Sequence, residues 1–217
     1  MVHQVVALVA VAEALGRKNI DRGSKMKHEV FRRELEYIKD ERIRTSCEII
    51  LDMLPDYFYE IPASSTGKYH PDFSLGVGGL VRHVKVAVRI AKELLDNPCI
   101  GDKYTSNEKD IMIFTLILHD GLKSGLVYNR YTQANHPTLI KDFVLENKDK
   151  IELTDKELEL FSRCVESHMG FWNTDYDGNE ILPRPKTKYE NFVHMCDFLS
   201  SKKFLNVKFK DNEIDER

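Results

Sequence analysis

Apolar positions recur along this chain with the spacing of amphipathic helices. In residues 81–96 they fall at i, i+3, i+4 and i+7, which places one continuous apolar face on a helix. Leu158, Phe161 and Val165 share one helical face in the same way. Strand-like alternation occurs only in residues 204–209, FLNVKF, which predict a short strand. The pattern as a whole predicts an all-α fold.

Helix starts are marked by local signals that agree with this pattern. Residues 111–118 are apolar at almost every position and follow a capping signal, which predicts a fully buried helix. His136-Pro137 suits a helix start, because proline is favoured in the first turn. Three capping boxes pair a threonine with a glutamate three positions later: Thr105 with Glu108, Thr154 with Glu157, and Thr187 with Glu190.

The N-terminal part divides into three stretches. Residues 1–25 are rich in alanine and valine and are compatible with an extra helix, while residues 27–54 predict one or two amphipathic helices. Residues 56–79 are rich in proline, glycine and serine and predict a long loop. We therefore expect a helical N-terminal extension over residues 1–60 and a main domain over residues 61–210.

Composition narrows the function classes. The chain of 217 residues has 32 Lys and Arg against 35 Asp and Glu, a net charge of −3, which speaks against binding along extended duplex nucleic acid. The apolar run VVALVAVAEAL is too short for a membrane span, so no membrane association is expected. The four cysteines lack C-x-x-C spacing, which favours a reduced, cytoplasmic location.

The chemistry of the chain centres on a histidine–aspartate doublet. His119 and Asp120 end the most apolar run, and Lys123 follows in the sequence ILHDGLKSG. Imidazoles and carboxylates on inward helix positions would destabilise a core if unpaired, but a shared metal ion would satisfy them together. The candidate metal ligands in chain order are His83, His119, Asp120, His136, His168 and Asp197. This ligand set suits Zn, Mn, Fe or Ni rather than Ca.

Ordinary structural roles account for the other candidates. A single histidine on an apolar face is generally a hydrogen-bonded core residue, and His3, His28 and His70 are assigned to that class or to the surface. His194 lies one turn before Asp197, so its sequence position allows either a site role or a core role. Cys164 and Cys196 are expected to be small core residues.

Four stretches together resemble the HD-domain metal-dependent phosphohydrolases. GVGGLVRHVKVAVRIAKELL resembles the family's "GGL…H" helix, LILHDGLKSG its "HD-x-x-K" signature, SHMGFWNTDYDG its "HHG" segment, and PRPKTKYENFVHMCDFLSS its closing helix. Within the family, the arrangement of these motifs is most similar to that of the 3′–5′ exoribonucleases and the dinucleoside-polyphosphate hydrolases. The resemblance covers about residues 76–203 and implies an HD-type helical bundle over 61–210, with the metal site between core helices.

The resemblance also implies roles for the site residues. His83, His119, Asp120 and Asp197 would bind one divalent ion, and His136 and His168 would complete a second that Asp120 bridges. One or two ions per chain are thus expected, of Mn, Fe, Ni, Mg or Zn. Asp120 and Lys123 are the catalytic candidates, since Lys123 would neutralise a substrate phosphate. Among the remaining residues, Arg130 suits phosphate, and Tyr131 and Trp172 suit a nucleobase.

The sequence therefore predicts hydrolysis of a phosphate ester or anhydride in a nucleotide or short oligonucleotide. Two alternatives remain open at this point. One is a 3′–5′ exonuclease or phosphodiesterase acting on single-stranded nucleic acid. The other is a nucleotide-binding HD module without turnover. Tyr176, close to Trp172 in sequence, is a further stacking candidate, with ordinary loop packing as its alternative.

Overall fold

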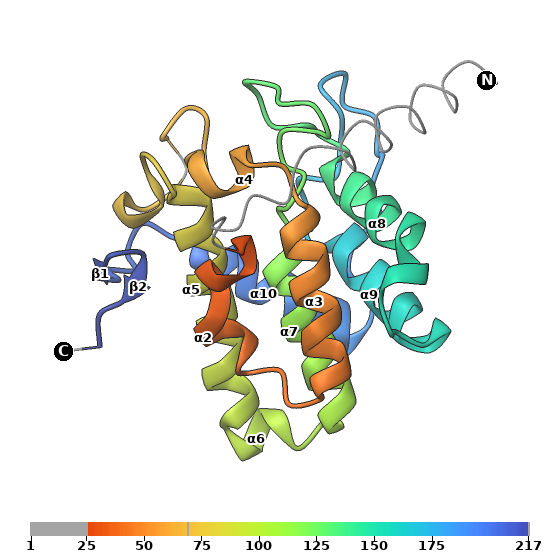
Figure 1. Ribbon diagram of the computed structural model, residues 1–217. Coiled ribbons are helices and arrows are strands. Elements are labelled where there is room, and N and C mark those ends of the chain that lie inside the picture. The colour runs from red at the N-terminus through yellow and green to blue at the C-terminus, as the bar shows by residue number, and fades with distance from the viewer. Residues whose placement is uncertain (1–25, 69, 217) are drawn as a thin grey trace.

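The computed structural model describes residues 26–68 and 70–216, and they form an all-α bundle with one short hairpin (Figure 1). This confirms the predicted fold class. The helices are η1 (Lys27–Phe31), α2 (Arg32–Leu35), α3 (Glu41–Met53), α4 (Tyr57–Glu60), η2 (Asp72–Ser74), α5 (Gly79–Asp96), α6 (Pro98–Gly101), α7 (Ser106–Leu118), α8 (His136–Glu146), η3 (Lys148–Lys150), α9 (Asp155–Ser167) and α10 (Lys188–Ser200). The strands are β1 (Phe209–Lys210) and β2 (Glu213–Ile214).

Helix α7 is the centre of the bundle. Every residue from Asp110 to Leu118 is buried, as the continuous apolar run predicts, and the helix contacts α3, α5, α9 and α10. The capping boxes of Thr105, Thr154 and Thr187 are all present and begin α7, α9 and α10. These local signals therefore fix where three of the core helices start.

The N-terminal elements belong to the same hydrophobic core as the rest. Phe31, Ile43 and Phe58 are fully buried and lie in one cluster with residues of α5, α7, α9 and α10. The core thus runs across residue 60, and the division of the chain there remains a prediction. The stretch 1–25, with its expected helix and His3, lies outside the described residues.

Two sequence predictions need correction. The strand expected over 204–209 is wrong for most of its length, because residues 204–208 have no partner strand among the described residues and Phe204 is exposed. The strand begins only at Phe209, which pairs with Ile214. The turn between the two strands contains Asp211 and Asn212, which both have positive φ. The long loop over 56–79 contains α4 and η2, since Tyr57 and Phe58 turn into the core.

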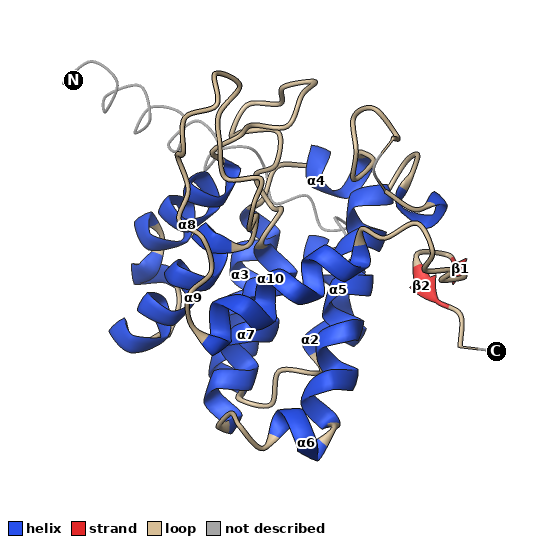
Figure 2. Cartoon of the chain, turned by 180° about the vertical axis from the view of Figure 1, so that it is seen from behind, coloured by secondary structure: helices blue, strands red, loops and turns tan. Residues whose placement is uncertain are grey.

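The loops that follow α7 and α9 rise at the same end of the bundle, as the two opposite views of Figure 1 and Figure 2 show. The Tyr176 hydroxyl donates to the carbonyl oxygen of Thr132 at 2.8 Å, which joins the two loops directly. The C-terminal hairpin lies at the left edge of the view in Figure 1, beside α5, where the Glu213 carboxylate meets the buried Lys85 ammonium at 2.5 Å. No helix in residues 26–68 and 70–216 combines the length and apolar character that a bilayer crossing demands.

Candidate metal centre

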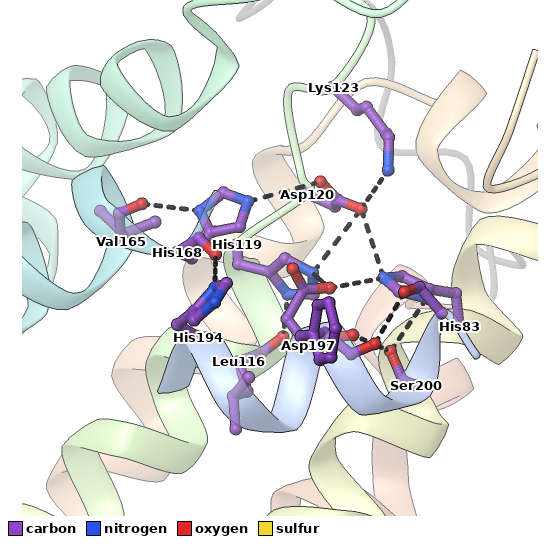
Figure 3. Close-up of polar contacts among 12 residues, drawn as sticks. His83, Leu116, His119, Asp120, Lys123, Val165, His168, His194, Asp197 and Ser200 are labelled. Atoms are coloured by element: carbon purple, nitrogen blue, oxygen red, sulfur yellow. Dashed lines mark hydrogen bonds and ion pairs between the residues drawn. The ribbon is translucent and has the colours of Figure 1, made fainter. Parts of the chain in front are cut away.

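Six side chains from five helices and their ends converge in the middle of the bundle, and Figure 3 labels all of them except His136. His119 and His168 are the residues that follow the last turns of α7 and α9, and Asp120 comes directly after His119. The other three come from α5, α8 and α10, and they are His83, His136 and Asp197. All six are buried except Asp197, whose side chain is 18% exposed and so opens the centre to one side.

The four imidazoles are oriented by hydrogen bonds at Nδ1. Nδ1 of His119 lies 2.7 Å from the carbonyl oxygen of Leu116, and Nδ1 of His168 lies 2.7 Å from that of Val165. His136 repeats this spacing of three residues, with Nδ1 at 2.8 Å from the carbonyl oxygen of Gln133. Because a carbonyl only accepts, each of these Nδ1 atoms donates, and Nε2 is the ring nitrogen left to face the centre.

His83 reaches the same state through a serine hydroxyl. The Ser200 hydroxyl donates to the carbonyl oxygen of Asp197 at 2.7 Å, so its oxygen accepts from His83 Nδ1 at 3.1 Å. Partners of this kind hold the tautomer and ring orientation of metal-binding histidines. Ser200 is thus a supporting residue of the centre that sequence reasoning missed. Its position one helical turn after Asp197 was the available signal.

The Nε2 atoms face two carboxylates. Asp197 Oδ1 lies 2.9 Å from His83 Nε2 and 3.3 Å from His119 Nε2. Asp120 Oδ2 lies 3.6 Å from each of the same two nitrogens. The other oxygen of Asp120, Oδ1, faces the second pair, at 3.1 Å from His136 Nε2 and 3.9 Å from His168 Nε2. Asp120 therefore stands between two histidine pairs and offers one oxygen to each.

Electrostatics keep both carboxylates ionised inside the bundle. Burial alone would raise the pKa of Asp120, but the charges of Lys123 and His119 hold it well below its usual range. The pKa of Asp197 is also well below its usual range, because His119 and His83 outweigh its burial. Burial lowers the pKa of His168 to about 3, so this ring is neutral. The centre therefore combines negative charge with nitrogen lone pairs, as a cation site requires.

The described residues contain two His/Asp groups whose ligand atoms are close enough to hold a metal ion. One consists of His83, His119 and Asp197, and the other of His119, Asp120 and His168. The Nε2 atom of His119 is buried, has no hydrogen-bond partner among the described residues, and points toward both carboxylates. A divalent ion would give this nitrogen a partner, and mixed nitrogen and oxygen donors suit Mn, Fe, Ni or Zn. The residues present thus fit a divalent metal.

A small pocket of about 180 Å³ opens beside the centre. Lys123 lines this pocket, and its Nζ atom also lies 2.6 Å from Asp120 Oδ2. Arg130 lines the same pocket, as do the polar residues Ser65, Ser124 and Thr132. We call it the Lys123–Arg130 pocket; its remaining walls come from residues 61–63 and Tyr128. The structure therefore brings two of the predicted substrate-binding residues together.

The two predicted stacking residues lie elsewhere on the loops. The Tyr131 ring is 57% exposed and lies outside the pocket lining, with the Arg130 guanidinium 5.8 Å from its centroid. Trp172 stacks on Phe198 of α10, with ring centroids 6.0 Å apart. Tyr176 is exposed and bonds the neighbouring loop through its hydroxyl. These rings are available at the surface but do not line the Lys123–Arg130 pocket.

Three further histidines are also placed. His194 donates from Nδ1 to the carbonyl oxygen of His168 at 2.6 Å, so it supports the loop after α9. His28 bonds Asp52 at 2.8 Å, away from the centre. His70 was assigned to an ordinary core or surface role, but its ring centroid lies 5.1 Å from that of His83, and its Nδ1 atom is buried without a hydrogen-bond partner. Its loop has no helical period, so no sequence signal predicted this neighbour.

No protein-family model matches the chain, and no curated protein or solved structure does so either. The case for a function therefore rests on the residues of the centre and their geometry.

Proposed function

We propose that this chain is an HD-type, metal-dependent phosphohydrolase that cleaves a phosphate ester or anhydride of a nucleotide or short oligonucleotide. The observation that carries the proposal is the common orientation of the four imidazoles. Each has Nδ1 engaged with a backbone carbonyl or a serine hydroxyl and Nε2 directed toward Asp120 or Asp197. Four imidazole nitrogens and two ionised carboxylates gathered inside one bundle are the donor set of a divalent cation site.

The residues fit two adjacent divalent ions. His83, His119, Asp120 and Asp197 would hold one ion, while Asp120, His136 and His168 would hold the other. Divalent ions at these positions would lower the pKa of water and polarise a phosphoryl oxygen, which is the chemistry of phosphate hydrolysis. Asp120 is the natural shared ligand, since its two oxygens face different histidine pairs.

Lys123 has the position of a substrate-binding cation. Its ammonium group lies 2.6 Å from Asp120 Oδ2, and its side chain also lines the pocket beside the centre. A phosphate bound at the centre would therefore meet this ammonium, which would orient the phosphate and reduce the negative charge that opposes attack by water. The partly exposed Asp197 provides the open side from which a substrate enters.

A second candidate, a 3′–5′ exonuclease on single-stranded nucleic acid, is favoured by the exposed rings around the centre. Tyr131 and Trp172 lie on the two loops that rise at one end of the bundle, and each carries a nearby cation, Arg130 or Lys202, with 5.8 Å to the ring centroid in both cases. Aromatic rings alternating with cations are typical of surfaces that bind single strands. The two candidates share one chemistry and differ in the length of the substrate.

The test combines metal analysis with a substrate panel. The purified protein should contain a transition metal, and after chelation and reloading it should hydrolyse a generic diester such as bis(4-nitrophenyl) phosphate, together with nucleotides, cyclic dinucleotides or short RNA and DNA. A KM that falls steadily with nucleic-acid length, with a steep salt dependence, would favour the exonuclease. Tight metal and nucleotide binding without turnover of any substrate would contradict the proposal and favour the non-catalytic HD module.

A further inference from the structure

The Lys123–Arg130 pocket has the charge of an anion site. None of its lining residues is acidic, and two of them are cations. Within the part of the chain that the structure describes, no carboxylate pairs with Arg130, and its guanidinium lies 5.8 Å from the centroid of the Tyr131 ring. A guanidinium beside a pocket and without a carboxylate partner is suited to bidentate binding of a phosphate. The hydroxyl groups of Ser65, Ser124 and Thr132 add further hydrogen-bond donors to the same pocket.

The size of the pocket limits what can enter it. Its volume of about 180 Å³ is smaller than the roughly 300–1,000 Å³ of pockets that enclose whole drug-sized ligands. A phosphate group with its attached oxygens is much smaller than a complete nucleoside and suits a pocket of this size. The base and sugar of a substrate would therefore remain outside the pocket.

Lys123 connects this pocket to the metal centre. The backbone amide of Lys123 bonds the carbonyl oxygen of Asp120 at 3.0 Å, and the carbonyl oxygen of Lys123 accepts from the amide of Gln133 at 2.8 Å. These bonds hold the backbone turn after Asp120, so Lys123 has a fixed position relative to Asp120. A group in the pocket would consequently lie near a phosphate bound at the centre, because Lys123 belongs to both.

We propose that the Lys123–Arg130 pocket binds a second phosphate of the substrate, adjacent to the phosphate that is hydrolysed. This inference rests on the proposed function and makes the substrate class narrower. The preferred substrate carries two neighbouring phosphates, as a nucleoside polyphosphate or a 5′-phosphorylated oligonucleotide does. Simple monoesters and diesters with a single phosphate leave the pocket without its anion and are poorer substrates.

The net charge that the centre would have with two divalent ions bound also favours a substrate with two phosphates. Asp120 and Asp197 contribute two negative charges, against four positive charges from two divalent ions and one from Lys123. Ions held by Asp120 would compete with Lys123 for its carboxylate, so Lys123 would lose much of its counter-charge. Arg130 adds a further cation, so the centre and pocket together favour a ligand with several negative charges over one with a single charge.

The experiment compares Arg130→Gln with Arg184→Gln as a matched control, because Arg184 lies on the other loop and pairs with Glu180. On metal-loaded protein, kcat/KM is measured for AMP against ADP and for a dinucleotide with and without a 5′-phosphate. The wild type should favour the doubly phosphorylated member of at least one pair about tenfold, mainly through KM. Arg130→Gln should abolish that preference, and Arg184→Gln should retain it. The favoured pair identifies the anhydride or the oligonucleotide as the source of the second phosphate.

Calorimetry with inorganic ligands gives a readout that does not depend on turnover. Metal-loaded wild-type protein should bind pyrophosphate about tenfold more tightly than inorganic phosphate, and Arg130→Gln should reduce this ratio toward one. Equal ratios in the wild type and Arg130→Gln would overturn the inference. If the wild type hydrolyses the generic diester but shows no preference in either pair and no tighter pyrophosphate binding, only the second-phosphate site fails. If it hydrolyses nothing, the proposed function fails, and the calorimetric ratios still decide the pocket.

Discussion

The Nε2 atoms of His136 and His168 lie 3.3 Å apart, although each ring already donates its Nδ1 proton to a backbone carbonyl. In the neutral form both Nε2 atoms are acceptors, and Asp120 Oδ1 adds a third acceptor at 3.1 Å from His136. Burial lowers the pKa of His168 to about 3, so that ring does not relieve the contact by taking up a second proton near neutral pH. These three atoms are a donor set that a divalent ion would satisfy together.

The first prediction concerns metal stoichiometry. We expect two ions per chain in the wild type, and His136→Gln or His168→Gln should lower the number toward one, because each removes a nitrogen ligand of one position only. Inductively coupled plasma mass spectrometry on desalted protein measures the ratio. His28→Gln is the matched control, since His28 bonds Asp52 away from the centre and should keep two ions. If both site variants keep the wild-type number of ions per chain, these histidines are core residues and not metal ligands.

The second prediction separates catalysis from folding at two buried aspartates. Asp120→Asn should lower turnover of a generic diester at least about 10³-fold while the far-ultraviolet circular dichroism stays that of the wild type, because one charged ligand is lost from the centre. Asp110 is also buried, but its carboxylate accepts the backbone amides of Lys39 and Asp40. Asp110→Asn should therefore lower the melting temperature and leave the activity of the folded protein. Substantial activity in Asp120→Asn with added Mn²⁺ would exclude the mechanism.

The sequence was sufficient for features that are encoded locally. The capping boxes of Thr105, Thr154 and Thr187 each require only residues three positions apart, and the apolar run of α7 needs no partner to be recognised. His119 and His168 could both be placed on inward helix positions from the apolar pattern alone. The periodicity of the apolar positions was therefore enough to predict most residues of the candidate centre.

Contacts between distant segments could not be read in the same way. His70 lies beside His83 because a loop folds back over α5, and the pairing of Phe209 with Ile214 depends on a turn of two residues with positive φ. The alternation in residues 204–209 predicted a strand at the wrong place, because a strand needs a partner that the pattern does not specify. The Lys123–Arg130 pocket likewise combines residues 61–65 with residues 123–132.

The third prediction tests the support of His83 by Ser200. Ser200→Ala removes the acceptor of His83 Nδ1, so the ring loses its fixed orientation, and metal affinity should fall about 10- to 100-fold. A Mn²⁺ titration followed by competition calorimetry measures this change. Ser201→Ala is closely matched, because the Ser201 hydroxyl also donates to a carbonyl three residues back at 2.7 Å but contacts no histidine. Equal affinities in the two variants would show that Ser200 only caps the end of α10.

The last prediction concerns stability against acid, away from the centre. The buried carboxylate of Glu157 accepts from Arg42 Nη2 at 2.7 Å, Asn107 Nδ2 at 2.6 Å and the amide of Thr154 at 2.6 Å, so it joins α3, α7 and α9. Burial alone would raise its pKa, but the hydrogen bonds from Arg42 and Thr154 lower it to about 2.

Since the folded pKa of Glu157 lies below the unfolded value of about 4.3, its contribution is complete above that pH and is lost as the pH falls toward 2. Glu157→Gln should therefore lower the free energy of unfolding by about 2 kcal/mol at pH 7, and the difference from the wild type should shrink steadily below pH 4. Urea denaturation from pH 7 to pH 2.5 measures both. Glu159→Gln, at an exposed position of the same helix, should follow the wild-type curve throughout. A difference between the wild type and Glu157→Gln that stays constant with pH would show that the side chain acts through packing and not through its charge.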